Sequence, residues 1–190
     1  MNFSIPDYKE RLVKFNSTEK YFAELVFLRK LLEPASGDRI LDYGCGTGTC
    51  IRFISQDGCH VKGFDTVRYL EDPDSRLYME EAEKFNKIYF LHSIAHIPDL
   101  PEVLVNLKTL HLERGGKIFV ITPNREFDDL FRLKRTDPVH TDPTVQKHFS
   151  LAELEELFVQ SGFHVISKGS FGKMEQDIPE RIFMVAQSNN

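Results

Sequence analysis

The chain has 190 residues, of which 41% are hydrophobic, and this is enough for one domain with an ordinary apolar core. The net charge of −5 argues against a broad basic surface, so binding to nucleic acid is disfavoured. No stretch approaches the roughly 18 apolar residues of a membrane span, and residues 1–14 lack an apolar core. We therefore expect neither a membrane helix nor a secretion signal.

The three cysteines, Cys45, Cys50 and Cys59, lie close together in the sequence. Their odd number and their spacing fit neither a disulfide framework nor a common zinc site. A reducing compartment fits them best, which predicts a cytoplasmic location. We interpret Cys45 and Cys50 as small buried residues, because nothing nearby in the sequence supplies a base or a partner.

The first predicted helix covers residues 16–33. Asn16 and Glu19 have the spacing of a capping box, and Pro34 ends the segment. Apolar side chains recur at helical spacing in between, at Tyr21, Leu25, Leu28 and Leu32.

A βαβ unit is predicted to follow. Residues 39–43 are typical of a short buried strand, which leads into a glycine-rich turn and a helix over 49–56 that ends at Gly58. Further strands are predicted at 60–65, 87–91 and 117–122, with a crossover helix over 100–112. Because strands alternate with helices, the sheet should be mostly parallel.

The last third of the chain predicts a different arrangement. Ser150 and Glu153 form a capping box for a helix through Ser161, and strands at 163–168 and 181–187 should form an antiparallel edge pair. The polar segment 124–149 is longer than a connector within a compact domain needs to be. We expect it to be a substrate loop or a lid within one domain spanning 1–190, in which helix 16–33 acts as a cap.

The glycine-rich turn is the densest functional signal. Apolar residues from Ile40 lead into Gly44, Gly46 and Gly48, and a helix follows. Glycines at the carboxyl end of a strand let the backbone approach a ligand where a Cβ would clash. A dinucleotide fingerprint requires a third glycine at the position occupied by Thr49, so NAD and FAD are disfavoured.

The segment ILDYGCGTG resembles motif I of class I S-adenosylmethionine-dependent methyltransferases. Asp65 lies about 20 residues after Gly44, the distance at which an acid reaches ribose hydroxyls in such sites. FNKIYFLHSIAHIPD, ERGGKIFVITPN and HFSLAELEELFVQSGF resemble later segments of the family in the expected order. The resemblance implies a doubly wound α/β fold, with a mostly parallel seven-stranded sheet, an antiparallel C-terminal edge hairpin and helices on both faces.

The resemblance also implies S-adenosylmethionine as cofactor. Asp42 would hold the methionine ammonium, Asp65 the ribose hydroxyls, and Glu81 the adenine amino group, with Glu80 or Glu83 as replacements for Glu81. The short distance from Asp65 to Asn86 means that the adenine side must be abbreviated, and we interpret Asn86 as structural. The implied cofactor-binding set is Asp42, Tyr43, Gly44, Cys45, Gly46, Gly48, Asp65, Thr66, Glu81, Ala82, Leu91 and His92.

Histidines supply the candidate catalytic groups, because a hydroxyl acceptor benefits from a general base and an amine acceptor needs only orientation. His96, His140 and His148 are the catalytic candidates, alongside His92 after the fourth strand. His96 also suits packing at a helix start, and His140 suits a solvated loop. The family's small-molecule branch implies acceptor walls at Tyr21, Phe22 and 127–132.

The predicted function is methyl transfer from S-adenosylmethionine to an oxygen or nitrogen of a small-molecule acceptor. The alternative is a non-catalytic relative that serves as a binding or partner subunit, which the abbreviated region after Asp65 keeps open. Asp128, Asp129, Asp137 and Asp142 are interpreted as solvated rather than metal-binding. Leu91 to Ile94 lack the tetrapeptide typical of nucleobase amino-methylation, and no Tyr-x-x-x-Lys pair supports an oxidoreductase.

Overall fold

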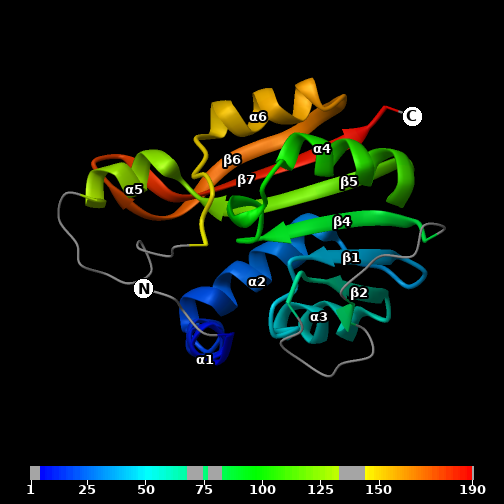
Figure 1. Cartoon of the computed structure of the whole chain (residues 1–190), viewed down its shortest axis with the longest axis horizontal. Helices are drawn as coiled ribbons and strands as arrows, with labels where there is room; N and C mark the ends of the chain where they lie inside the picture. The colour runs from blue at the N-terminus through cyan, green and yellow to red at the C-terminus, as the bar shows by residue number, and fades with distance from the viewer. Residues whose placement is uncertain (1–4, 68–74, 77–82, 133–143, 190) are drawn as a thin grey trace.

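A computed structural model describes residues 5–67, 75–76, 83–132 and 144–189 of the chain (Figure 1). Its strands are β1 (Arg39–Tyr43), β2 (His60–Phe64), β3 (Ser75–Arg76), β4 (Phe85–Leu91), β5 (Leu112–Pro123), β6 (Phe163–Glu175) and β7 (Ile178–Ser188). Its α-helices are α1 (Ile5–Asn16), α2 (Glu19–Leu32), α3 (Thr49–Ile54), α4 (Leu100–Asn106), α5 (Arg125–Arg132) and α6 (Leu151–Gln160). No helix among these residues is long and apolar enough to cross a membrane.

The described strands form one seven-stranded sheet in the order β3-β2-β1-β4-β5-β7-β6. Neighbours from β3 through β5 are parallel, whereas β7 runs antiparallel to both β5 and β6. This confirms the predicted α/β fold, with its mostly parallel sheet and antiparallel C-terminal hairpin. The order reverses at β1 and β4, which is where open α/β sheets bind ligands.

Successive side chains of a strand point to opposite faces of the sheet, so the buried strands present apolar residues on both faces. Helices cover both of these faces. On β4, Ile88 and Phe90 pack with α4 and α6. Tyr89 and Leu91, on the same strand, face α2 and α3 instead. The near-continuous apolar runs of β4 and β5 therefore supply two cores, one on each face.

The beginning of α2 differs from the sequence prediction. Thr18 is the N-cap, and its hydroxyl accepts a hydrogen bond from the Tyr21 amide at 3.1 Å. The predicted capping box of Asn16 with Glu19 is wrong, because Asn16 ends α1 and its side chain donates to the Thr47 and Thr49 hydroxyls instead. The predicted box of Ser150 with Glu153 is confirmed at the start of α6.

Other boundaries also shift. The predicted crossover helix over 100–112 is confirmed, because α4 runs to Asn106 and continues as a π-helical turn over Leu107–His111, but β5 begins at Leu112, earlier than predicted. Helices α1 and α5 were not predicted. Helix α5 begins the polar segment after β5, and the rest of that segment up to residue 143 lies outside the described residues.

The parallel strands all point toward one edge of the sheet, at the left in Figure 1. Helices α1 and α5 lie at this edge (Figure 1). The carboxyl ends of β1, β2 and β4 thus converge where the glycine-rich turn begins.

Candidate functional site

The glycine-rich turn leaves β1 and doubles back toward α3. Gly44, Gly46 and Gly48 have φ angles of 88°, 51° and 68°, a region that side chains with a Cβ rarely adopt. The Gly44 and Cys45 amides both donate to the Phe64 carbonyl, at 2.7 and 3.1 Å. A Cβ on Gly44 would also overlap the side chain of Ser93, which donates to the Tyr43 carbonyl.

Asp42 is buried at the carboxyl end of β1. Burial raises its pKa to about 7, and the nearby Asp65 carboxylate acts in the same direction while Tyr89 opposes it. No cationic side chain among the described residues contributes to the pKa of Asp42. A desolvated carboxylate in this setting is suited to a bound ammonium group.

Asp65 follows β2 and faces the turn. Its Oδ2 accepts from the Gly46 amide at 2.8 Å, and its Oδ1 accepts from the Val67 amide at 3.1 Å. Burial raises the pKa of Asp65, and these backbone donors partly offset the rise. A carboxylate has about four acceptor positions, so it retains capacity for ligand hydroxyl groups.

Helix α1 lies against the turn. The Asn16 side-chain amide donates to the hydroxyls of Thr47 at 2.9 Å and Thr49 at 3.3 Å. Leu12 is the neighbour that a Cβ on Gly46 would approach, at 3.5 Å. A small hollow of about 240 Å³ opens between α1 and the start of α3.

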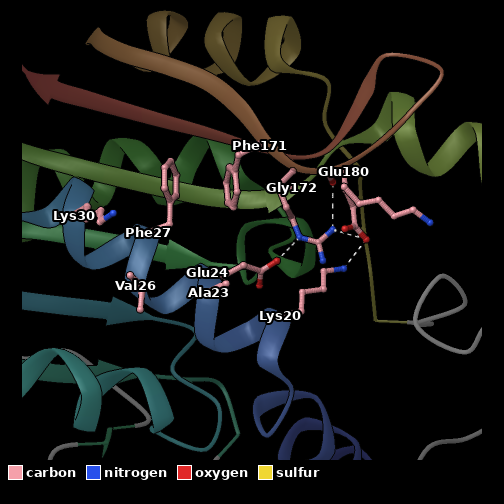
Figure 2. A pocket seen from close by; sticks show the side chains of 11 residues that line it. Lys20, Ala23, Glu24, Val26, Phe27, Lys30, Phe171, Gly172 and Glu180 are labelled. Carbon is pink, nitrogen blue, oxygen red and sulfur yellow. Dashed lines mark hydrogen bonds and ion pairs between the residues drawn. The ribbon is translucent and has the colours of Figure 1, made fainter.

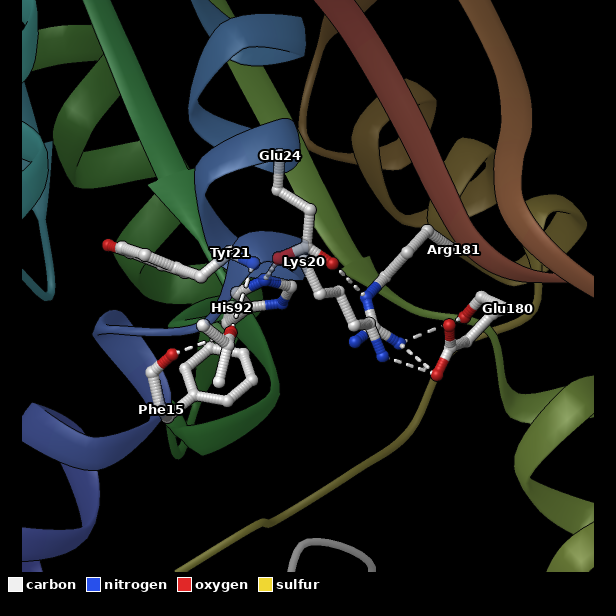
Figure 3. Close-up of polar contacts among 8 residues, drawn as sticks. Phe15, Lys20, Tyr21, Glu24, His92, Glu180 and Arg181 are labelled. Atoms are coloured by element: carbon white, nitrogen blue, oxygen red, sulfur yellow. Dashed lines mark hydrogen bonds and ion pairs between the residues drawn. The ribbon is translucent and has the colours of Figure 1, made fainter.

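A buried network joins α2 to the ends of β4 and β7 (Figure 3). One Glu24 carboxylate oxygen lies 2.6 Å from His92 Nε2, and the other accepts from Arg181 Nε at 2.7 Å. Burial alone would raise the pKa of Glu24, but His92 and Arg181 outweigh it and hold the pKa at about 2. His92 has a φ of 62° and its ring packs edge-on against Phe15 of α1.

The other histidines lie around the end of β5 and the turn after β4. His148 Nδ1 lies 2.9 Å from Oδ2 of the buried Asp128 on α5. The adjacent Phe149 bridges to Asn124, directly after β5. His96 Nδ1 lies 2.8 Å from the Thr144 hydroxyl, and His140 lies outside the described residues.

The adenine side is only partly described. Glu80, Glu81 and Ala82 lie outside the described residues. Glu83 precedes β4, at the opposite edge of the sheet from the turn, and pairs with Lys62. Asn86 accepts from the Arg39 amide and donates to Asp38, a structural role as predicted. Cys45, Cys50 and Cys59 are buried and form no disulfide, and burial was the interpretation for the first two.

The predicted acceptor walls separate in space. Tyr21 is buried against Phe15, and Phe22 points to Phe53 of α3. Phe127 belongs to the buried interior. Thr66 follows Asp65, and Leu91 and His92 lie at the end of β4, beside β1.

Sequence reasoning missed Asn16, Glu24, Ser93 and Arg181, whose roles depend on contacts between distant segments and leave no local motif.

Known proteins resemble the chain in sequence and in fold. The family described as "methyltransferase domain" matches residues 15–168. Ubiquinone biosynthesis O-methyltransferase of Xylella fastidiosa is 30% identical over 110 residues, covering 48% of this chain and 44% of that protein. The enzyme of the same name from Coxiella burnetii is 28% identical over 108 residues, covering 48% and 46%. The chain therefore spans less than half the length of these relatives.

Two solved structures share the fold. A SAM-dependent methyltransferase from Archaeoglobus fulgidus superposes with a TM-score of 0.74 at 16% identity, over 95% of this chain and 99% of that one. Phosphoethanolamine N-methyltransferase 2 from Haemonchus contortus, solved with S-adenosyl-L-methionine, gives 0.65 at 16% identity, over 90% and 53%. The chain belongs to the methyltransferase-domain family and has the fold of class I S-adenosylmethionine-dependent methyltransferases.

Proposed function

We propose that this protein is an enzyme that transfers a methyl group from S-adenosylmethionine to an oxygen or nitrogen atom of a small molecule. The observation that carries the proposal is Asp42, a buried carboxylate without a described cationic partner, placed beside a turn of three glycines with positive φ. A site of this kind fits the methionine ammonium of the cofactor. When bound, S-adenosylmethionine supplies an electrophilic methyl group on a sulfonium sulfur.

In this proposal the cofactor is bound by the backbone of the glycine-rich turn and by the carboxylates of Asp42 and Asp65. Asp42 binds the ammonium, and the backbone from Gly44 to Gly48 lies along the methionine and ribose. Asp65 accepts hydrogen bonds from ribose hydroxyls, as its remaining acceptor capacity supports. The other proposed contacts are those of Tyr43, Cys45, Thr66, Glu81, Ala82, Leu91 and His92.

On the acceptor side, we assign the proton acceptor to His148. Asp128 lies on the Nδ1 side of the ring, which leaves Nε2 as the nitrogen that takes a proton from a hydroxyl. His148 sits beside the end of β5, whereas His92 sits between Glu24 and α1 near the turn. His96 and His140 remain secondary candidates, and segment 124–149 remains a proposed substrate loop or lid.

The small-molecule acceptor rests on the relatives, among which an O-methyltransferase and an N-methyltransferase are named. Three buried cysteines that form no disulfide support a reducing location, for which we propose the cytoplasm.

Calorimetry combined with a transfer assay tests this function. S-adenosylmethionine should bind wild-type protein, and binding should weaken at least tenfold in Asp42→Asn, because the ammonium loses its charged partner. Transfer of a labelled methyl group is then measured with catechol and phosphoethanolamine as acceptors.

His148→Gln should lower transfer to catechol roughly a hundredfold, the usual contribution of a general base, while cofactor affinity stays within twofold. Failure of the cofactor to bind would overturn the proposal. Tight binding without transfer to any acceptor would favour the non-catalytic partner subunit.

A further inference from the structure

A groove of about 400 Å³ lies between α2 and the β6–β7 hairpin, apart from the glycine-rich turn (Figure 2). This volume falls in the range of small-molecule sites. Strand β7 enters the sheet here, with Arg181 opposite Pro123 at the end of β5. The groove thus opens at the ligand-binding edge of the sheet, but none of the proposed cofactor-binding residues lines it.

The apolar wall of the groove is aromatic. The rings of Phe27 and Phe171 lie with centroids 4.2 Å apart, and Phe183 packs edge-on against Phe27 at 5.2 Å. The pairing of β6 with β7 shifts register between Phe171 and Met174, and Gly172 within this bulge has a φ of 95°. Bulges of this type bend a strand and redirect its side chains, and they are frequent next to binding sites.

The polar rim of the groove is positively charged. Lys20 pairs with Glu180, and Arg181 pairs with Glu24 and Glu180, so these four side chains are mutually satisfied. Lys30 and Lys173 also line the groove and are exposed. Neither forms an ion pair with any side chain in the described part of the chain, which leaves a surplus of two positive charges.

We propose that this groove binds a small amphipathic anion, with an aromatic or alkyl body against Phe27 and Phe171 and its acidic group attracted by the positive rim, to which Lys30 and Lys173 contribute the unpaired charges. The aromatic wall gains from covering apolar surface, and the two ammonium groups gain from a negative charge. The Glu24–Arg181 pair separates the groove from His92. The proposed binding of the anion does not rest on the proposed methyl transfer.

The test uses two matched fluorescent probes without cofactor. One is 8-anilinonaphthalene-1-sulfonate, and the other is N-phenyl-1-naphthylamine, which has the same aromatic body without the sulfonate. Wild-type protein should bind the anion at least tenfold more tightly than the neutral probe. Nuclear Overhauser contacts should connect the bound anion to the rings of Phe27 and Phe171.

Removing the cationic rim should abolish this preference. In the double variant Lys30→Gln/Lys173→Gln, affinity for the anionic probe should fall about tenfold at low salt, while affinity for the neutral probe changes less than twofold. Arg114→Glu changes the net charge by the same amount at an exposed site near the beginning of β5, and it should leave both affinities unchanged. The proposal would be overturned if the double lysine variant and Arg114→Glu lost the same affinity for the anionic probe. Nuclear Overhauser contacts of the probe at another site would also overturn it.

Discussion

At the scale of single residues, burial of the Asp42 carboxylate lowers the stability of the folded protein, although the same carboxylate is proposed to bind the cofactor. An aspartate in an unfolded chain has a pKa of about 3.9, whereas burial raises the pKa of Asp42 to about 7. Between these values the folded protein holds a proton that the unfolded chain releases. The free energy of unfolding therefore decreases as the pH rises from about 4 to 7, and the loss is complete above pH 7.

Asp42→Asn should remove this pH dependence, because asparagine has nearly the same shape and carries no charge. The stability of the variant relative to wild type should be about 2–3 kcal/mol more favourable at pH 8 than at pH 5. Urea unfolding at the two pH values measures the difference. If the stability difference between the variant and wild type were the same at pH 5 and pH 8, the Asp42 carboxylate would not titrate in this range.

The glycines of the turn should separate folding from binding. Gly44→Ala places a Cβ into Ser93 at a φ of 88°, so we expect unfolding to become easier by roughly 2–4 kcal/mol. Gly46→Ala meets only Leu12 at 3.5 Å, and backbone strain should cost about 1 kcal/mol.

Urea unfolding and cofactor titration distinguish the two variants. Gly46→Ala should fold but bind S-adenosylmethionine at least tenfold more weakly, since its Cβ occupies space beside the ligand. Cofactor affinity retained within twofold in Gly46→Ala would place the ligand elsewhere.

Local patterns anticipated the residues of this turn better than those of the Glu24 network. The residues of the turn, Gly44 to Gly48, follow Asp42 closely in the sequence. The spacing of the glycines directly indicates positions where the backbone needs a positive φ angle. Glu24 lies on a helix whose apolar residues predict only packing. Its partners His92 and Arg181 follow β4 and begin β7, so only the assembled sheet brings the three together.

At the scale of elements, helix α1 packs against the glycine-rich turn through Asn16 and Leu12. Asn16→Ala removes two hydrogen bonds to Thr47 and Thr49, which should weaken docking of α1 by about 1 kcal/mol. Amides of residues 9–16 should then exchange roughly fivefold faster with deuterium than in wild-type protein. Lys14→Ala, at an exposed position of the same helix, serves as control and should exchange like wild type. Equal acceleration in both variants would mean that the Asn16 contacts do not hold α1.

The sequence predicted six of the seven described strands and most of the described helices, but not β3, α1 and α5. Helix α1 carries Pro6 and many charges, and its apolar side chains Leu12 and Phe15 find partners on distant segments, namely the glycine-rich turn, Tyr21 and His92. Helix α5 begins with REFDD, which suggested a solvated loop. Its stability depends on Phe127 and Asp128, which are buried by the assembled fold.

At the scale of the whole molecule, the two faces of the sheet have different tasks. The face covered by α4 and α6 is a continuous apolar core. The other face, under α2 and α3, also holds Asp42, Tyr89 and Cys50, and burial raises the pKa of each of these acidic groups. A fold that keeps such a face desolvated without ligand should be stabilised globally when a ligand supplies the missing positive charge.

Thermal unfolding tests this coupling and the cofactor class together. S-adenosylmethionine at about 100 times its dissociation constant should add about 2.7 kcal/mol to the free energy of unfolding. For a chain of this size, that gain raises the melting temperature by roughly 5–10 °C. NAD at the same concentration should produce no shift, because Thr49 replaces the glycine that a dinucleotide requires. The shift should fall to half or less in Asp42→Asn, because an affinity loss of tenfold or more leaves at most about 1.4 kcal/mol. A shift with NAD in wild-type protein would reassign the turn to dinucleotide binding.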